Sequence, residues 1–308
     1  MRIAVPDLVS NSYFLASAAD ALGFYRAEGL DLTAVLISPI EKCLLALRNG
    51  EVDFVGAATH SPLLSFPEFQ GAKLLCAQSQ GLYWFLVMRR ALGLKRGELD
   101  GLKGTRIAAA PFVGLTLRRV LVAAGINLER ERIEIVNPPV SRLPGVNFGV
   151  AAAEALDKGE IDGFFANGMG TEVAVRRGVG DVVLDLRRGD GPPECFNYTM
   201  SSIFTTDRLI ADNPQAAAAV VRAIVHTQKA LKSDITQAGA AGKKLFPAYE
   251  AGLIADIVLR DLPFYRPEIS YSSVTAMLGF ARDIGMLKSD KLSYQQVVAA
   301  QFSNLWDL

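Results

Sequence analysis

The chain reads Ala46-Leu-Arg-Asn-Gly-Glu-Val-Asp-Phe-Val-Gly-Ala-Ala58, and this stretch decides the fold because it returns as Ala155-Leu-Asp-Lys-Gly-Glu-Ile-Asp-Gly-Phe-Phe-Ala-Asn167. Each copy is typical of a helix end stopped by glycine, an acidic turn and entry into a buried strand. Such a repeat indicates two halves built on one α/β plan. The alternative is a single turn type that the chain uses twice.

Short strands and helices alternate around the two copies, as in parallel α/β proteins. We expect a strand at 3–5, one helix over 12–26, and further strands and helices in turn as far as residue 186. From Pro214 onward the pattern predicts helices without a strand, and Asn213-Pro214 is a strong helix start because a capping side chain precedes proline.

Two α/β lobes predict a ligand cleft between them, because open parallel sheets bind ligands beyond the carboxyl ends of their strands. The runs 83–90 and 197–205 have the length and β character of two crossover strands that act as hinges. Lobe 1 is therefore predicted to comprise residues 1–86 and 201–308, with the helical tail packing on it, and lobe 2 residues 87–200.

Composition excludes several other classes of protein. Half of the 308 residues are apolar, 21% are charged, and 32 basic residues balance 32 acidic ones. Such a chain can bury a large core and carries no basic footprint for nucleic acid. Its apolar runs are too short for a membrane span, so we expect a soluble protein without membrane insertion.

Cysteine and histidine usage gives metal or disulfide chemistry little to build on. Cys43, Cys76 and Cys195 are widely spaced and follow no ligand pattern, which favours buried free thiols. His60 and His226 are far apart in sequence, so we expect neither a metal nor another cofactor. The chain opens on a predicted strand without a leader sequence, which leaves a cytoplasmic location open.

Four strings follow one another along the chain, namely Ala21-Leu-Gly-Phe-Tyr-Arg-Ala-Glu-Gly-Leu-Asp-Leu32, Ala46–Asp53, Leu102-Lys-Gly-Thr-Arg-Ile-Ala108 and Asp207-Arg-Leu-Ile-Ala-Asp-Asn-Pro214. In this order they resemble signatures of the type II periplasmic solute-binding proteins. The resemblance is to the branch that serves ABC transporters for sulfonates, taurine, nitrate and thiamine precursors, and it spans roughly residues 1–300. Together they are fairly specific for the two-lobed fold and less so for the ligand.

The resemblance implies the substrate-binding component of an ABC transporter, which closes about a hinge on a small molecule. Its implied partners are a membrane permease and an ATPase, its implied location is the periplasm, and we expect a monomer. A transcription regulator of the same architecture would begin with a helix-turn-helix, whereas this sequence opens on the first strand of the lobe.

The resemblance also implies that ligand contacts come from loops at strand ends. In lobe 1 these loops supply hydroxyl, amide, imidazole and phenol groups, from Asn11, Tyr13, Ser38, Thr59, His60 and Ser61. Helix N-termini at such loops favour an acceptor or an anion, and simple capping of the helix is the alternative. We expect His60 to contact the ligand and His226 to be a structural residue of the tail.

At the first crossover the candidate ligand contacts are the aromatic Tyr83 and Trp84, and in lobe 2 they are Gly114, Thr116, Arg142 and Asn167. Val113 and Leu115 stand where relatives place hydroxyl donors at a helix start, and this departure disfavours a sulfonate or phosphate ligand. The predicted ligand is therefore neutral or singly anionic and partly aromatic or apolar. Among these candidates, charge would come from Arg142.

An enzyme on the same fold is the alternative function, desulfinase- or decarboxylase-like, with His60 and Cys195 as its reacting pair. The thiamine-pyrimidine synthase family also resembles this chain in placing a histidine soon after such a strand. That family needs a lysine on the strand for pyridoxal phosphate, and 54–58 contains none. We expect binding rather than catalysis, with His60 as a hydrogen-bonding wall and no cysteine within about 4 Å of its ring.

Overall fold

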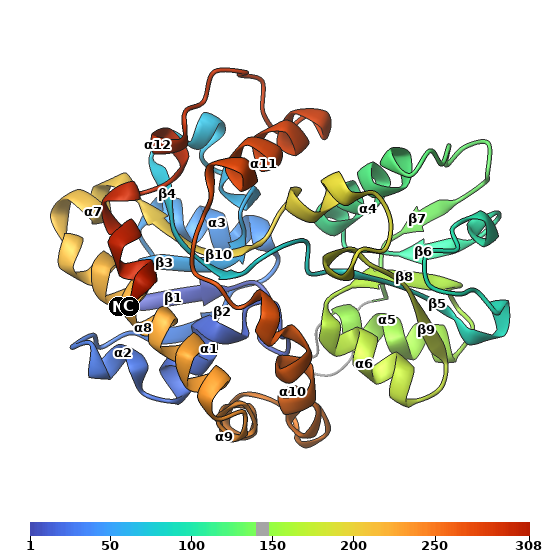
Figure 1. Ribbon diagram of the computed structural model, residues 1–308, viewed down its shortest axis with the longest axis horizontal. Coiled ribbons are helices and arrows are strands. Elements are labelled where there is room, and N and C mark those ends of the chain that lie inside the picture. Colours follow the sequence, from blue (N-terminus) through green and yellow to red (C-terminus); the bar gives the residue numbers. More distant parts are fainter. Residues whose placement is uncertain (140–147) are drawn as a thin grey trace. The chain divides into compact units, whose positions relative to one another are not determined.

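The computed structural model describes residues 1–139 and 148–308, and the chain forms two compact units (Figure 1). Unit 1 comprises Met1–Gly81 and Asn197–Leu308, and unit 2 comprises Leu82–Phe196. Each unit holds a five-stranded sheet, so the two α/β halves that the repeat predicted are present.

The sheet of unit 1 has the strand order β2-β1-β3-β10-β4. Its strands are β1 (Arg2–Val5), β2 (Thr33–Leu36), β3 (Phe54–Ala58), β4 (Ala72–Ser79) and β10 (Ser201–Thr206). β1, β2 and β3 run parallel, whereas β10 runs antiparallel to β3 and β4. The carboxyl ends of the three parallel strands therefore meet at one edge of the sheet.

The sheet of unit 2 repeats this order as β7-β6-β8-β5-β9. Its strands are β5 (Phe85–Arg89), β6 (Arg106–Ala108), β7 (Glu134–Val136), β8 (Gly163–Ala166) and β9 (Gly180–Asp185). β5 runs antiparallel to β8 and β9 and takes the place that β10 has in unit 1. Both predicted crossover runs thus contain a strand, and their action as hinges stays a prediction.

The helices are α1 (Phe14–Ala21), α2 (Phe24–Ala27), α3 (Ile40–Asn49), α4 (Pro111–Ala123), α5 (Phe148–Asp157), α6 (Gly168–Arg176), α7 (Asp207–Asp212), α8 (Pro214–Ser233), α9 (Thr236–Leu245), α10 (Ala248–Asp261), α11 (Tyr271–Asp283) and α12 (Tyr294–Val297). The tail is helical as predicted, and its α8 packs against α1 and α2. The Asn213 side chain caps α8 by accepting from the N–H of Ala216 at 3.1 Å. In the described part of the chain, the helices are too short or too polar to cross a membrane.

The single helix predicted over 12–26 is wrong. α1 ends at Ala21 and α2 begins at Phe24, because Gly23 between them has a φ of 85°. Glycine adopts this left-handed conformation at no steric cost, and a residue in it cannot continue a right-handed helix. The apolar spacing runs on through the break, so periodicity alone did not reveal it.

The two copies of the repeat fold into matching turns. α3 and α5 are each followed by a glycine in the left-handed region, with φ of 76° at Gly50 and 74° at Gly159. The next residue in each copy returns its N–H to the helix at 2.9 Å, from Glu51 to the Ala46 carbonyl and correspondingly in the second copy. This is the helix C-terminus that the two glycines predicted.

An aspartate then ties each turn to a parallel neighbouring strand, β1 in unit 1 and β6 in unit 2. The carboxylate of Asp53 accepts from the backbone N–H of Arg2 at 2.7 Å, and that of Asp162 accepts from the N–H of Arg106 at 2.9 Å. In return, each aspartate N–H donates to the carbonyl of the same arginine at 2.9 Å. The two copies therefore share the same hydrogen bonds as well as the same sequence pattern.

Candidate functional site

The predicted residues of unit 1 follow the three parallel strands. Asn11 and Tyr13 lie between β1 and α1, Ser38 follows β2, and Thr59 begins the segment after β3 that also contains His60 and Ser61. Because the strands are parallel, these segments share one edge of the sheet. Ser38 is exposed, whereas the other five are buried at that edge.

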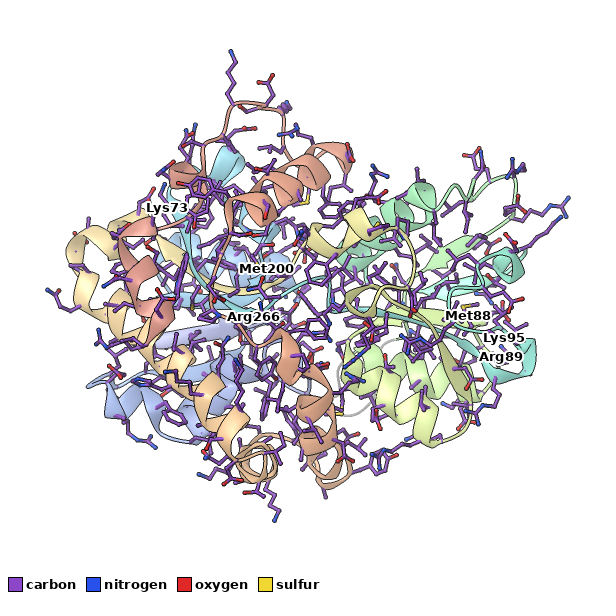
Figure 2. The ribbon with its side chains drawn as sticks, viewed as in Figure 1. Lys73, Met88, Arg89, Lys95, Met200 and Arg266 are labelled. Carbon is purple, nitrogen blue, oxygen red and sulfur yellow. The ribbon has the colours of Figure 1, made fainter. Side chains whose placement is uncertain are left out.

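His60 is held by hydroxyl groups from two segments of unit 1. Its Nδ1 lies 2.9 Å from Thr199 Oγ1, which in turn lies 3.0 Å from Thr59 Oγ1. Thr59 Oγ1 also accepts from the N–H of Met200, the residue before β10 that is labelled in Figure 2, at 3.3 Å. The loop after β3 and the segment entering β10 are thus joined side chain to side chain.

The imidazole of His60 is neutral at physiological pH. Its exposed fraction is 0%, and burial lowers the pKa of His60 to about 3, because the charged form loses its hydration. The ring meets that of Phe280 in α11 in a T-shaped arrangement, with centroids 5.1 Å apart and planes at 84°. His60 therefore offers polar ring atoms without a positive charge.

Ser61 behaves as the capping alternative predicts. Its hydroxyl donates to the carbonyl of Ala58 at 2.6 Å, within the turn that leads into a 3₁₀ helix at Ser61–Leu64. The proton of this hydroxyl is used by the backbone, so Ser61 shapes the loop that carries His60.

Asn11 is oriented by a carboxylate that the sequence analysis missed. The Asn11 amide nitrogen donates to Oδ2 of Asp261, at the end of α10, over 2.7 Å. Nε of Arg260 lies 3.1 Å from the other oxygen of the same carboxylate. Because the amide NH₂ of Asn11 points to Asp261, its carbonyl oxygen points the other way and is an acceptor.

In unit 2, the aromatic pair Tyr83 and Trp84 precedes β5. Their ring centroids lie 4.9 Å apart, and Trp84 also meets Phe165 of β8 edge-on at 6.1 Å. Both rings are almost fully buried. Packing alone accounts for these contacts, and a role in ligand binding stays a prediction.

Asn167 follows β8 and caps α6. Its side-chain oxygen accepts from the N–H groups of Met169 at 3.0 Å and Gly170 at 3.2 Å. The N-terminus of α6 is thus capped by the protein's own side chain, and Asn167, which is 2% exposed, directly follows the carboxyl end of β8.

The remaining candidates of unit 2 differ in what they contact. A Cβ on Gly114 would lie 3.3 Å from Cγ2 of Ile135, so this glycine allows α4 to pack closely on β7. Thr116 is fully buried in α4, and its Oγ1 has no hydrogen-bond partner among the described residues. Arg142 lies outside the residues that the structure describes.

Three buried polar residues were not predicted, namely Thr199, Asp261 and Arg187. Thr199 lay within the run expected to be a crossover strand, and its hydroxyl beside Ser201 and Ser202 was a usable signal. Asp261 ends a helix of the tail and gave no local signal. Arg187 follows β9, is 7% exposed, and places its guanidinium 5.7 Å from the centroid of the Phe85 ring.

Catalytic and metal-binding groups are poorly represented. Within residues 1–139 and 148–308, no cluster of three or more His, Cys, Asp and Glu side chains could hold a metal ion. His60 and Cys195 belong to different units. Burial raises the pKa of the Cys43 thiol to about 12 and that of Cys76 well above its ordinary value, which suppresses the reactive thiolate.

His226 lies in α8, where its Nδ1 is 3.1 Å from a carboxylate oxygen of Glu28.

Solved structures with similar folds define the class. The periplasmic nitrate-binding protein NrtA of Synechocystis PCC 6803 matches at a TM-score of 0.74 and 14% identity, over 99% of this chain and 86% of that chain. A putative periplasmic sulfonate-binding protein, SsuA of Methylobacillus flagellatus KT, matches at 0.67 and 17%, over 98% and 92%. The desulfurization enzyme DszB matches at 0.64 and 14%, over 98% and 97%. The fold is that of the two-lobed periplasmic binding proteins.

The family follows from the sequence itself. The model of the family described as "NMT1/THI5 like" matches residues 12–234, and the chain belongs to this family. No curated protein matches the chain. The resemblance predicted from the four strings is therefore confirmed at the level of family and fold.

Proposed function

We propose that the chain is the substrate-binding component of an ABC importer, which binds a small organic molecule reversibly and leaves it unchanged. Membership of the NMT1/THI5-like family and the fold shared with NrtA and SsuA support this function. A membrane permease and an ATPase are the proposed partners, and the periplasm is the proposed location. The fold alone would not suffice, because the same architecture also carries an enzyme.

The observation that carries the proposal is the polar, buried carboxyl edge of the unit 1 sheet. Asn11, Thr59 and His60 are 5% exposed or less, and each is oriented by a hydrogen bond to another segment of unit 1. Carboxyl ends of parallel strands are where open α/β sheets bind ligands. Fixed polar groups at this position are suited to orienting a ligand with little reorganisation.

The proposed ligand is neutral or singly anionic and partly aromatic or apolar. His60 contributes no charge, and Tyr83 and Trp84 offer aromatic surface. One negative charge on the ligand would pair with Arg142, which lies outside the described residues.

A thermal-shift screen tests this function. Sulfonates, carboxylates, amides and heterocycles would each be added to the purified chain, and at least one is expected to raise the Tm. A ligand at 100 times its Kd adds about 2.7 kcal/mol to the free energy of unfolding. A folded sample that no compound stabilises would contradict the proposal.

Matched tryptophan variants test whether Trp84 contacts the ligand. Trp84→Leu is expected to weaken binding of the stabilising compound by about 1–3 kcal/mol, because an aromatic face is lost. The other tryptophan, Trp306, donates from its indole to the Leu75 carbonyl at 3.1 Å, in a 3₁₀ helix of the tail, and Trp306→Leu is expected to leave the affinity unchanged. Equal losses in the two variants would mean that Trp84 acts only through stability.

A desulfinase-like enzyme is the second candidate, and the fold shared with DszB favours it. This function would need Cys195 as nucleophile and His60 as base. Release of sulfite from an aromatic sulfinate, abolished in Cys195→Ser, would replace the binding function with this one. Unchanged sulfinate after prolonged incubation would exclude it.

A further inference from the structure

The side-chain amide of Gln78 is buried near the carboxyl end of β4, and its polar atoms bind two other segments of unit 1. Oε1 accepts from the backbone N–H of Ala16 in α1 at 3.0 Å. Nε2 donates to Oγ of Ser201 at 3.0 Å and to the carbonyl of Ser202 at 3.3 Å, both in β10. Gln78 is 1% exposed, so water does not compete for these bonds. One amide therefore joins β4, β10 and α1.

The backbone partners fix the orientation of this amide. The N–H of Ala16 can only donate and the carbonyl of Ser202 can only accept, so the amide oxygen faces α1 and the amide nitrogen faces β10. Because this nitrogen donates to Ser201 Oγ, the hydroxyl proton of Ser201 has to find another acceptor. It goes to the carbonyl of Ser12, at 2.6 Å. Donors and acceptors are thus matched in one direction through the whole network.

This network holds the loop after β1, in which the candidate residue Asn11 lies. The N–H of Ser12 donates to Oγ of Ser10 at 3.1 Å, and the carbonyl of Ser12 is held by Ser201. Ala16 is the third residue of α1, and its N–H is the one that an N-cap side chain ordinarily takes. Tyr13, at the N-cap, is not a capping residue type, and Gln78 supplies the acceptor from 62 residues away.

β3 leaves room for the amide at Gly56. A Cβ on Gly56 would lie 3.2 Å from Nε2 of Gln78 and 3.2 Å from Cβ of Ala16. In the second copy of the repeat, the residue equivalent to Gly56 is Phe165, which is fully buried. Unit 2 thus builds the same sheet order with an apolar ring at this position, so the fold itself does not require a polar network there.

We propose that Gln78 is a positioning residue of the candidate ligand site, which holds the loop after β1 through Ala16 and Ser201. Because Ser201 begins β10, in the second crossover run, the same amide also ties this loop to that run. A loop that is held before the ligand arrives needs little reorganisation on binding. The inference deepens the proposed function, on which it rests for the presence of a ligand.

Native-state hydrogen exchange of the ligand-free chain tests the hold on the loop. Gln78→Met keeps the length of the side chain and removes its amide. The N–H of Ala16 is then expected to accelerate about tenfold more than the amides of β3, since one net hydrogen bond corresponds to about a factor of ten. If Gln78 only stabilised unit 1 as a whole, Ala16 and β3 would accelerate by the same factor, and this result would overturn the inference.

Two neighbouring serines provide a matched pair of milder variants. Ser201→Ala removes the hydroxyl that holds Ser12, and faster exchange is expected at Ser12 and Ala16 than in β3. Ser202→Ala removes a hydroxyl that donates within the sheet, to the carbonyl of Ala57 at 3.4 Å, and is expected to leave exchange in the loop unchanged. Equal effects of the two serine variants would refute the hold on the loop, whether or not Gln78→Met folds.

The compound that the thermal-shift screen identifies tests the link to the ligand. Its affinity is expected to fall about tenfold in Ser201→Ala and to stay unchanged in Ser202→Ala, because the first variant alone releases the loop that contains Asn11. A loosened loop with unchanged affinity would refute the role in the ligand site. A screen without a hit would contradict the proposed function, whereas the exchange rates, measured without ligand, still decide whether Gln78 holds the loop.

Discussion

The two sheets share the turn at their amino edge and differ at their carboxyl edge. At the amino edge, Asp53 and Asp162 make the same pair of hydrogen bonds to a parallel neighbouring strand, β1 and β6 respectively. At the carboxyl edge, Asn167 caps its own helix in unit 2, whereas His60 in unit 1 is held by Thr199, 139 residues away. The amino edge thus encodes the fold, while the carboxyl edge gives each unit its own chemistry.

The same division appears one residue after each aspartate. Phe54 in the first copy is fully buried, whereas Gly163 in the second copy lies against Met88 and Val87 of β5. The sheets are equivalent in topology. At this position, however, unit 1 accommodates a phenylalanine ring beside β10, whereas unit 2 has a glycine beside β5. Three experiments test how far the equivalence extends.

The largest expected effect comes from Phe54→Ala. Removing this buried ring from β3 should cost about 3–5 kcal/mol of the free energy of unfolding, because the cavity cannot fully collapse. Denaturant unfolding measures the loss. A cost below about 1 kcal/mol would show that the space beside β10 is not tightly packed.

Acid should act mainly through unit 1, which contains both histidines. The folded pKa of His60 is about 3, against 6.5 for the exposed group, so the unfolded chain binds a proton that the folded chain refuses between these values. The free energy of unfolding therefore falls as the pH falls, by about 1.4 kcal/mol per unit and about 2–3 kcal/mol from pH 6.5 to 4.5.

His60→Gln is the control for this prediction. Its unfolding free energy should depend less steeply on pH over the same range, by about one proton. Equal slopes in wild type and variant would mean that His60 takes up its proton without unfolding, and would remove the argument for a neutral ring.

The smallest expected effect comes from Gly163→Ala in unit 2. The added Cβ would lie 2.8 Å from the backbone oxygen of Val87, which cannot move without disturbing β5, so we expect a loss of about 1–3 kcal/mol. Gly239→Ala is the matched control, because Gly239 lies inside α9 with nothing within 4 Å, and a gain of about 0.5–1 kcal/mol is expected there. Similar values for the two variants would show that β5 yields to the methyl group.

The fold could be predicted because its signals are local. Each copy of the repeat contains its glycine, its acidic turn and its buried strand within one short stretch. The pair Asn213-Pro214 is likewise enough to predict where the helical tail begins. Gly23 shows the limit, since an apolar period continues through a backbone break that one positive φ creates.

The candidate site was predictable only in part. His60 and Asn11 could be found because they follow strands, but their partners could not. Thr199 lies 139 residues from His60, and Asp261 lies 250 residues from Asn11, so tertiary structure alone brings each pair together. Whether these groups bind a ligand stays a prediction that the screen decides.

The strand order of unit 1 also has a consequence for biosynthesis. β10 lies between β3 and β4, although the whole of unit 2 is synthesised before it. As the chain leaves the ribosome from its N-terminus, the place between β3 and β4 stays unfilled until unit 2 has been made, whereas the equivalent strand of unit 2, β5, is the first of its sheet to be synthesised. Unit 2 can complete its sheet during translation, and Thr199, whose hydroxyl lies 2.9 Å from Nδ1 of His60, arrives only afterwards.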